Sequence, residues 1–380
     1  MELINLIIKP TSECNLRCKY CYHASTNYVC GSLSMDKIKK LFELASDEYK
    51  EIKITWHGGE PMLLGREFYE EVFTFQQELE KTKNVSFMNT LQTNGTLIDR
   101  KWGKFFKKYH IIPGISFDGP THNDVMRQNS KDIIKGLKVL KSMKINAGCL
   151  AVINKYNIDQ TKLYQEMSPL CAALKFNPIF SPNGDEDFKI DENEYIKQTI
   201  ALFDYWLYDK KGKPVEPLHS YMYKSLGVPY NSCVNSSCLG KWLDIDSKGV
   251  IRTCGQSDSD QFIIGHIDNI SSLSEVFVSE SFNNLLRKAI ERRKKCLANC
   301  HLFKECQGNC IFKASIEGGI ENLNGFSCKA FKTIYSYVKT KTIKLIKDKV
   351  PLNKLNPIVR GIITDAMSKN SAFIMGLTDE

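Results

Sequence analysis

Short apolar runs alternate with longer amphipathic stretches six times between residue 3 and residue 180. The segments between the runs, such as 35–50 and 68–81, repeat apolar residues three and four positions apart, as helices with one buried face do. Alternating β and α units predict a parallel sheet with right-handed crossovers, either an open doubly wound sheet or an incomplete barrel. The predicted strands are residues 3–9, 51–57, 85–93, 111–117, 146–153 and 173–180.

The pattern changes after residue 180. A turn-rich stretch comes first, a helix is expected at 191–210, and cysteine, glycine and short hairpin-like segments dominate from 233 to 328. The chain after residue 328 is basic and amphipathic, which predicts a helix and leaves the segment after that helix unassigned. We therefore predict three parts: residues 1–225, 226–335 and 336–380.

The composition is typical of a globular protein, with 42% hydrophobic and 25% charged residues in 380. No stretch approaches 18 consecutive apolar residues, and the start "MELINLIIKP" lacks the basic segment of an export signal. We expect a cytoplasmic protein without a membrane partner. The net charge of +9 would suit an acidic partner, but a solvated basic surface explains it better, and nucleic acid is not an expected partner.

The fourteen cysteines call for another explanation than disulfides, because a reducing compartment keeps thiols reduced. Cys14, Cys18 and Cys21 are spaced CxxxCxxC directly after the first predicted strand. A structural zinc needs four ligands, and His23 and Cys30 are candidates for the fourth only by proximity. Three thiolates on a 4Fe–4S cluster would leave one iron open to a small molecule.

Three further motifs follow later predicted strands in order: "HGGEP" at 57–61, "QTNGT" at 92–96 and "SFDGP" at 116–120. Together with "CNLRCKYC" they resemble the radical SAM enzyme family. The resemblance implies a partial (β/α)6 TIM-type barrel and a 4Fe–4S cluster on the three cysteines. It also implies that the open iron binds S-adenosylmethionine through its amine and carboxylate.

The same resemblance implies residues that contact S-adenosylmethionine. Arg127 would also suit a surface ion pair and Phe180 a core position, and the sequence leaves both alternatives open. The implied contacts are Gly59 and Glu60 at the amine, Tyr20 along the pocket, Ser116 at the ribose, Arg127 at the carboxylate and Phe180 near the adenine.

The distal cysteines follow a second pattern, with Gly249 five positions before Cys254 and the run "CLANCHLFKECQGNC". It resembles the SPASM extension of radical SAM enzymes that modify peptides and proteins, and implies two auxiliary 4Fe–4S clusters. Two zinc sites are the alternative. Cys149 and Cys171 are expected to be small buried residues. By the resemblance, Cys233, Cys238, Cys254 and Cys310 hold the first auxiliary cluster, and Cys296, Cys300, Cys306 and Cys328 hold the second.

Among SPASM enzymes, residues 3–335 most resemble the anaerobic sulfatase maturases, and the chain also resembles maturases of ribosomally made peptides. Sulfatase maturases carry an aspartate as base directly after the third cysteine of the first auxiliary cluster, where this chain has Gly255. His23, Asp258 and Asp260 are the remaining candidate bases. The last quartet also opens as CxxxC, where CxxC is more usual.

The resemblance implies reductive cleavage of S-adenosylmethionine to a 5′-deoxyadenosyl radical, with electrons from a donor such as flavodoxin or ferredoxin. We consider three hypotheses. The first is a peptide maturase that forms a cross-link, a thioether or a related oxidation, and Gly255 favours it. The second is a formylglycine-generating sulfatase maturase. The third is a non-catalytic iron–sulfur or zinc protein. A peptide or protein substrate would meet the barrel mouth, the SPASM surface or the basic tail, whose charge is otherwise a solvated helix face.

Overall fold

The computed structural model describes residues 2–21, 31–179, 188–230, 238–256 and 259–370. The chain forms two compact units. The first comprises residues 1–116, 126–147 and 237–295, and the second comprises residues 117–125, 148–236 and 296–380. The two units are groups of residues whose backbones pack closely together, and they do not correspond to the three predicted parts. The predicted division at residues 225 and 335 therefore stays a prediction.

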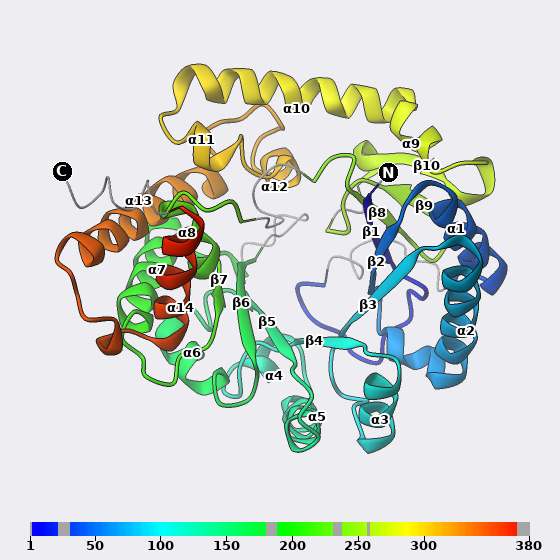
Figure 1. The fold of residues 1–380 in the computed structure, drawn as a ribbon, viewed down its shortest axis with the longest axis horizontal. Coiled ribbons are helices and arrows are strands. Elements are labelled where there is room, and N and C mark those ends of the chain that lie inside the picture. Colours follow the sequence, from blue (N-terminus) through cyan, green and yellow to red (C-terminus); the bar gives the residue numbers. More distant parts are fainter. Residues whose placement is uncertain (1, 22–30, 180–187, 231–237, 257–258, 371–380) are drawn as a thin grey trace. The chain divides into compact units, whose positions relative to one another are not determined.

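Four strands predicted from the apolar runs form the centre of the first unit. They are parallel and neighbour one another in chain order, as a repeated β–α unit requires. Side chains alternate between buried and partly exposed along β1, so one face of the strand is sealed. The strands are β1 (Leu3–Ile8), β2 (Glu51–Trp56), β3 (Ser86–Thr93) and β4 (Ile112–Ser116) (Figure 1).

Amphipathic helices follow these strands and bury their apolar faces. Ser34 and Asp99 cap two of them by accepting hydrogen bonds from the backbone N–H groups of Lys37 and Trp102. The predicted helices at 35–50 and 68–81 are confirmed, with slightly different ends. The helices are α1 (Met35–Glu48), α2 (Gly65–Lys83), α3 (Arg100–Lys108), α4 (Asn123–Met126) and α5 (Ser130–Ser142), with a 3-10 turn, η2 (Pro61–Leu64), before α2.

A second set of strands extends the sheet of the first unit beyond β1. Strand β8 (Trp242–Ile245) pairs with β1 in parallel, and β9 (Val250–Arg252) and β10 (Ile263–His266) follow antiparallel. Gly249 forms the β8–β9 turn at φ +93°, where a Cβ would lie 2.6 Å from Ile267 Cγ2. The hairpin predicted in this region is therefore present.

One long helix in the cysteine-rich region differs from the prediction of short hairpin-like segments. Helix α10 (Glu280–Asn299) buries Phe282, Leu285 and Ala289, which recur at helical spacing. Charged residues dominate its second half, so its apolar stripe is short and is hard to recognise in the sequence. Helix α9 (Ser274–Val278) precedes it, and short 3-10 turns, η4 (Asp260–Phe262) and η5 (Ile267–Asn269), flank β10.

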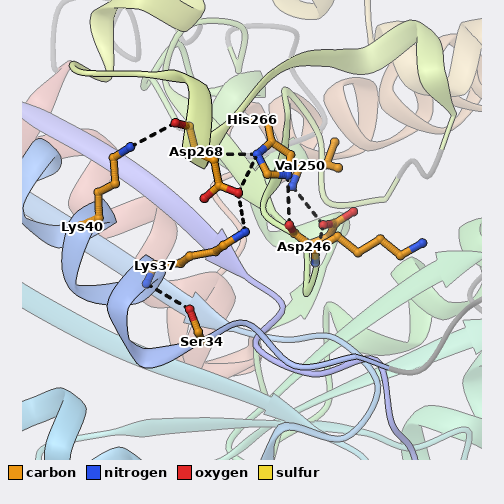
Figure 2. Close-up of polar contacts among 8 residues, drawn as sticks. Ser34, Lys37, Lys40, Asp246, Val250, His266 and Asp268 are labelled. Atoms are coloured by element: carbon orange, nitrogen blue, oxygen red, sulfur yellow. Dashed lines mark hydrogen bonds and ion pairs between the residues drawn. The ribbon is translucent and has the colours of Figure 1, made fainter.

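Polar contacts join the turn after β10 to helix α1 within the first unit (Figure 2). Lys37 Nζ lies 2.6 Å from Asp268 Oδ2, and Lys40 Nζ donates to the Asp268 carbonyl at 3.5 Å. His266 Nδ1 accepts from the Asp268 N–H and holds the turn in place. These groups are exposed, so each pair contributes little to stability and mainly fixes the position of the turn.

The second unit has three parallel strands, and its helices pack on one another through aromatic side chains. Tyr221 meets Tyr335 and Phe331 edge-on, and Tyr337 donates to Asp204 at 2.6 Å. The strands are β5 (Gly148–Ile153), β6 (Ala173–Pro178) and β7 (Val215–Glu216). The helices are α6 (Gln160–Met167), α7 (Glu192–Trp206), α8 (Leu218–Ser225), α11 (Phe303–Cys306), α12 (Ile311–Ile316), α13 (Phe326–Lys347) and α14 (Pro357–Lys369), with a 3-10 turn, η6 (Leu352–Lys354), before α14.

The predicted strands at 146–153 and 173–180 and the helix at 191–210 are confirmed within the described residues. The basic tail forms α13 and then α14, and α13 buries one face that includes Phe331 and Tyr335. In the part of the chain that the structure describes, no helix has an apolar stretch long enough to cross a membrane. The α/β architecture is therefore observed, and its closure into a partial barrel stays a prediction.

A buried ion pair connects β1 with β8. Lys9, directly after β1, places Nζ 3.2 Å from Asp244 Oδ2, and the two side chains are 1% and 0% exposed. Taking both charges out of water is costly, and each is tolerated because the other is present. The pair therefore fixes the register between the first strand and the added hairpin.

Replacing one partner of this pair is expected to destabilise the protein strongly. Asp244→Asn should lower the free energy of unfolding in urea by about 3–5 kcal/mol, because Lys9 is left buried without its counter-charge. The double variant Lys9→Met/Asp244→Leu should lose much less, since no charge remains buried. Asp268→Asn, on the exposed pair, is the matched control and should stay close to wild type. A double variant that is as unstable as Asp244→Asn, or less stable, would contradict this account.

Candidate cofactor site

The loop after β1 carries the three closely spaced cysteines. The N–H of Cys21 donates to the carbonyl of Cys18 at 3.1 Å and forms a turn. Burial raises the pKa of the Cys14 thiol, and the negative charges of Glu60 and Cys21 raise it further. Cys14 and Cys21 are therefore close enough to interact, as two ligands of one cluster must be.

Residues 58–60 hold this loop through their backbone. The N–H of Gly59 donates to the Thr11 carbonyl at 3.0 Å, and the N–H of Glu60 donates to the Glu13 carbonyl at 2.7 Å. A Cβ on Gly59 would lie 2.1 Å from the Glu13 oxygen, and one on Gly58, at φ +117°, would lie 2.4 Å from the Thr11 oxygen. The glycines therefore allow close approach to the cysteine loop itself, whereas the sequence suggested close approach to a ligand.

Glu60 is fully buried and uses its carboxylate within the protein. Oε1 accepts hydrogen bonds from the Met62 N–H at 3.0 Å and the Thr93 hydroxyl at 2.8 Å, and Oε2 accepts from the Asn94 N–H at 2.8 Å. Burial raises the pKa of Glu60 to about 7, against the opposing effect of these three donors. The carboxylate is thus engaged within the protein, and the contact expected between residue 60 and S-adenosylmethionine stays a prediction.

A network of amides and hydroxyls extends from the end of β3 to the cysteine loop. Asn94 Nδ2 donates to Asn15 Oδ1 at 2.8 Å and points at Cys14 Sγ from 3.9 Å, and Asn15 donates to Thr96 at 2.9 Å. The sequence pattern indicated "QTNGT" only as a motif and gave no role to Asn94 or Asn15. Their positions, after the carboxyl ends of β3 and β1, were the feature of the sequence that could have indicated a role.

The remaining predicted contacts of S-adenosylmethionine are partly described. The Arg127 guanidinium lies over the Tyr20 ring, 5.1 Å from its centroid, and Arg127 is only 8% exposed, which does not fit a surface ion pair. Ser116 accepts a hydrogen bond from Gln92 Nε2 at 2.8 Å. Phe180 and the candidate base His23 lie outside the described residues.

Four cysteines gather around the ends of three helices. Cys296 lies in the last turn of α10 and Cys300 directly follows that helix, while Cys306 ends α11 and Cys328 lies in the first turn of α13. Burial raises the pKa of Cys306 to about 11, and the neighbouring charges of Cys328, Cys296 and Cys300 add to the rise. The structure thus brings together the quartet predicted for the second auxiliary cluster.

The metal centre of this quartet, an iron–sulfur cluster or the alternative zinc ion, stays a prediction. Among the described residues, no three histidine, cysteine or acidic side chains converge on a point that one metal ion would occupy. Lys224 is an unpredicted neighbour: its Nζ donates to the Glu305 carbonyl, and burial lowers its pKa to about 8 despite the opposing charge of Cys306.

The other predicted quartet is divided over the chain. Cys238 and Cys254 belong to the first unit, Cys310 to the second, and Cys233 lies outside the described residues. This ligand set therefore stays a prediction. The expectation that Cys149 and Cys171 are buried is confirmed, since they are 2% and 8% exposed.

An aspartate at position 255, as in sulfatase maturases, would require its neighbours to shift. A Cβ on Gly255 would lie 2.7 Å from Ile7 Cδ1 and 3.1 Å from Asp244 Oδ1. The buried carboxylate of Asp244 thus borders the place where a side chain at 255 would begin. Asp260 is exposed, and Asp258 lies outside the described residues, so their role as base stays a prediction.

Adding a methyl group at position 59 should displace the cysteine loop. In Gly59→Ala the new carbon would overlap the Glu13 carbonyl. After anaerobic reconstitution, the expected cluster on the three cysteines gives an electron paramagnetic resonance signal that changes when S-adenosylmethionine is added. We expect this signal to be lost in the variant. Gly361→Ala is the matched control, because nothing lies within 4 Å of a Cβ at that exposed helical position. An unchanged signal in Gly59→Ala would contradict the proposed close contact.

The acceptor role of Glu60 can be tested by an isosteric change. Glu60→Gln places an NH2 group where one of the buried donors now finds an oxygen, and should lower the free energy of unfolding in urea by about 1–3 kcal/mol. Glu78→Gln, an exposed position on α2, should stay near the wild-type value. Equal stability of Glu60→Gln and wild type would show that the carboxylate is not needed as a triple acceptor.

Comparison with known proteins agrees with this geometry. Residues 8–166 match the model of the radical SAM superfamily. The chain is 28% identical over 361 residues to a cysteine-type anaerobic sulfatase-maturating enzyme of Clostridium novyi, covering 88% of this chain and 95% of that protein. It is 24% identical over 373 residues to the radical SAM cyclopropyl synthase TigE of Paramaledivibacter caminithermalis, covering 88% of this chain and 73% of that protein.

A solved structure shares the fold. It is described as native anSMEcpe with bound AdoMet and Cp18Cys peptide, and it matches with a TM-score of 0.80 at 23% identity, covering 91% of this chain and 99% of that chain. The cysteine loop and the glycine contact both lie within residues 8–166, which match the radical SAM model. Residues 8–166 therefore form a radical SAM domain, and the chain is similar to anaerobic sulfatase-maturating enzymes and to radical SAM enzymes such as TigE.

Proposed function

We propose that this protein is a radical SAM maturase that oxidises a side chain of a peptide or protein substrate, by forming a cross-link, a thioether or a related bond. The observation that carries the proposal is the loop of Cys14, Cys18 and Cys21, held against the end of β2 by the backbone of Gly59 and Glu60. A rigid three-thiolate loop is what a cluster with one open iron requires.

Cysteines 14, 18 and 21 would hold the cluster that binds S-adenosylmethionine, and the two distal quartets would hold auxiliary clusters. When bound, these groups supply electron transfer and a 5′-deoxyadenosyl radical that takes a hydrogen atom from the substrate. The substrate radical would then give one electron to an auxiliary cluster and one proton to a base or to water, so the substrate would be oxidised by two hydrogens in total. A donor such as flavodoxin or ferredoxin would supply the first electron.

The residues of this chain would orient the reactants. The main chain at 59–60 and the Arg127 guanidinium suit the amine and carboxylate of S-adenosylmethionine, because a carbonyl accepts from an ammonium and a guanidinium donates to a carboxylate. Tyr20, in contact with Arg127, would limit the conformations of that side chain. Ser116, Phe180 and the remaining contacts belong to the same proposal.

Position 255 favours the peptide-maturase reaction over formylglycine formation. The latter needs a base that takes a proton from a cysteine or serine, whereas this chain has a glycine at 255, and an aspartate there would crowd Ile7 and Asp244. Asp244 is itself fully buried and paired with Lys9, which does not suit a group that must meet a substrate.

Formylglycine formation is the second candidate, because several relatives are named as sulfatase-maturating enzymes. The chain aligns with 95% of the length of the Clostridium novyi enzyme. The two reactions leave different products, so they can be separated directly: an aldehyde reacts with a hydrazide probe, whereas a cross-link or thioether does not.

The test is anaerobic production of the full chain with a candidate substrate, either a precursor peptide or a sulfatase. We expect bound iron and sulfide, release of 5′-deoxyadenosine, and a peptide lighter by two hydrogens without an aldehyde. Cys18→Ala should abolish release of 5′-deoxyadenosine, whereas Cys328→Ala should leave that release and abolish the modified peptide. An aldehyde on the sulfatase would select the second candidate, and stoichiometric zinc in place of iron and sulfide would refute both.

A further inference from the structure

We propose that Asn94 is a positioning residue of the cofactor site, whose side-chain amide donates a hydrogen bond to the Cys14 sulfur and raises the reduction potential of the cluster held there. The inference rests on the proposed function, because Cys14 must be a cluster ligand. It concerns one N–H group and one sulfur, and it assigns to the "QTNGT" motif a role in tuning the cluster.

Two N–H groups point at the Cys14 sulfur. Asn94 Nδ2 lies 3.9 Å from Sγ, and the backbone N–H of Leu16 lies 3.4 Å from it. The backbone contact arises from the fold of the loop itself, whereas Asn94 comes from the end of β3, 80 residues away in the chain. A substitution at 94 therefore removes one donor without altering the sequence of the cysteine loop.

The orientation of the Asn94 amide follows from its other partners. Asn94 Oδ1 accepts from the Thr96 N–H at 3.0 Å and from the Thr96 hydroxyl at 2.7 Å. Both partners are donors, so the atom facing them is the oxygen, and the NH2 group must face Cys14 and Asn15. The backbone N–H of Asn94 is bonded to Glu60 Oε2, which also fixes the main chain.

The electrostatic effect of this contact has a definite sign. Reduction adds an electron to a cluster and places more negative charge on its sulfurs, so an N–H aimed at a ligand sulfur stabilises the reduced form. Asn94 is only 8% exposed, and a buried hydrogen bond is less weakened by water than an exposed one. Loss of the donor should therefore make the cluster harder to reduce.

Asn89 on β3, five positions before Asn94, provides a matched control. It is as buried as Asn94, but it bonds Trp56 Nε1 at 2.9 Å and Gln76 at 2.8 Å, on the helix-covered side of β3. Asn89→Ala should perturb packing without changing the potential. The pair of variants thus separates a loss of structure from a loss of the donor.

The experiment measures the midpoint potential of the cluster in anaerobically reconstituted full-length protein, by electron paramagnetic resonance at controlled potentials. The relevant signal is the one that changes when S-adenosylmethionine is added. For Asn94→Leu, which keeps the size of the side chain but removes the donor, we expect a more negative midpoint. The ratio of reduced to oxidised cluster at a fixed potential should fall roughly three- to tenfold, and tenfold corresponds to 59 mV for one electron.

Thr96→Val is a second variant, which keeps Asn94 but removes the hydroxyl that orients its amide. It should shift the midpoint in the same direction by less, and it remains informative if Asn94→Leu fails to bind iron. An unchanged or more positive midpoint in either iron-loaded variant overturns the inference, as does an equal shift in Asn89→Ala. If wild-type protein binds no cluster, the proposed function fails too, whereas an intact cluster with unshifted potential refutes only the role of Asn94.

Discussion

The backbone contact between residues 58–60 and the loop 11–13 is the constraint on which the cofactor site depends. Two N–H groups meet two carbonyls at a separation that a Cβ on either glycine would prevent. The buried carboxylate of Glu60 extends this contact, because it accepts hydrogen bonds from Thr93 and Asn94. These contacts join the segments after three successive strands around Cys14 and position the cysteine loop.

The buried ion pair at the end of β1 also bears on Gly255, the position at which sulfatase maturases carry an aspartate. Lys9 requires a buried counter-charge, and Asp244 on β8 supplies it. Because Asp244 borders the place where a side chain at 255 would start, a second aspartate there would bring two carboxylates together beside one lysine. Glycine at 255 is therefore consistent with the charges of its surroundings, and this local arrangement of charge fits the proposed change of reaction.

The sequence predicted a large part of the fold for identifiable reasons. The six apolar runs became β1 to β6, because buried strands of a parallel sheet need continuous apolar residues. Helix α10 was missed, because its apolar stripe is short and charged residues dominate its second half. The quartet around Cys306 was grouped by resemblance, and only the structure shows that the charges of Cys328, Cys296 and Cys300 help to raise the pKa of Cys306.

What the sequence by itself determined is the order of β and α units, the cysteine spacing and the motifs at strand ends, because each depends on residues near one another in the chain. Only the tertiary structure decided that Gly59 meets the Glu13 backbone, that Glu60 is occupied by three internal donors, and that the Asn94 amide faces the Cys14 sulfur. The longer of these contacts join residues 33 to 80 positions apart. Their partners are chosen by the register of neighbouring strands, a property that no local pattern of residues encodes.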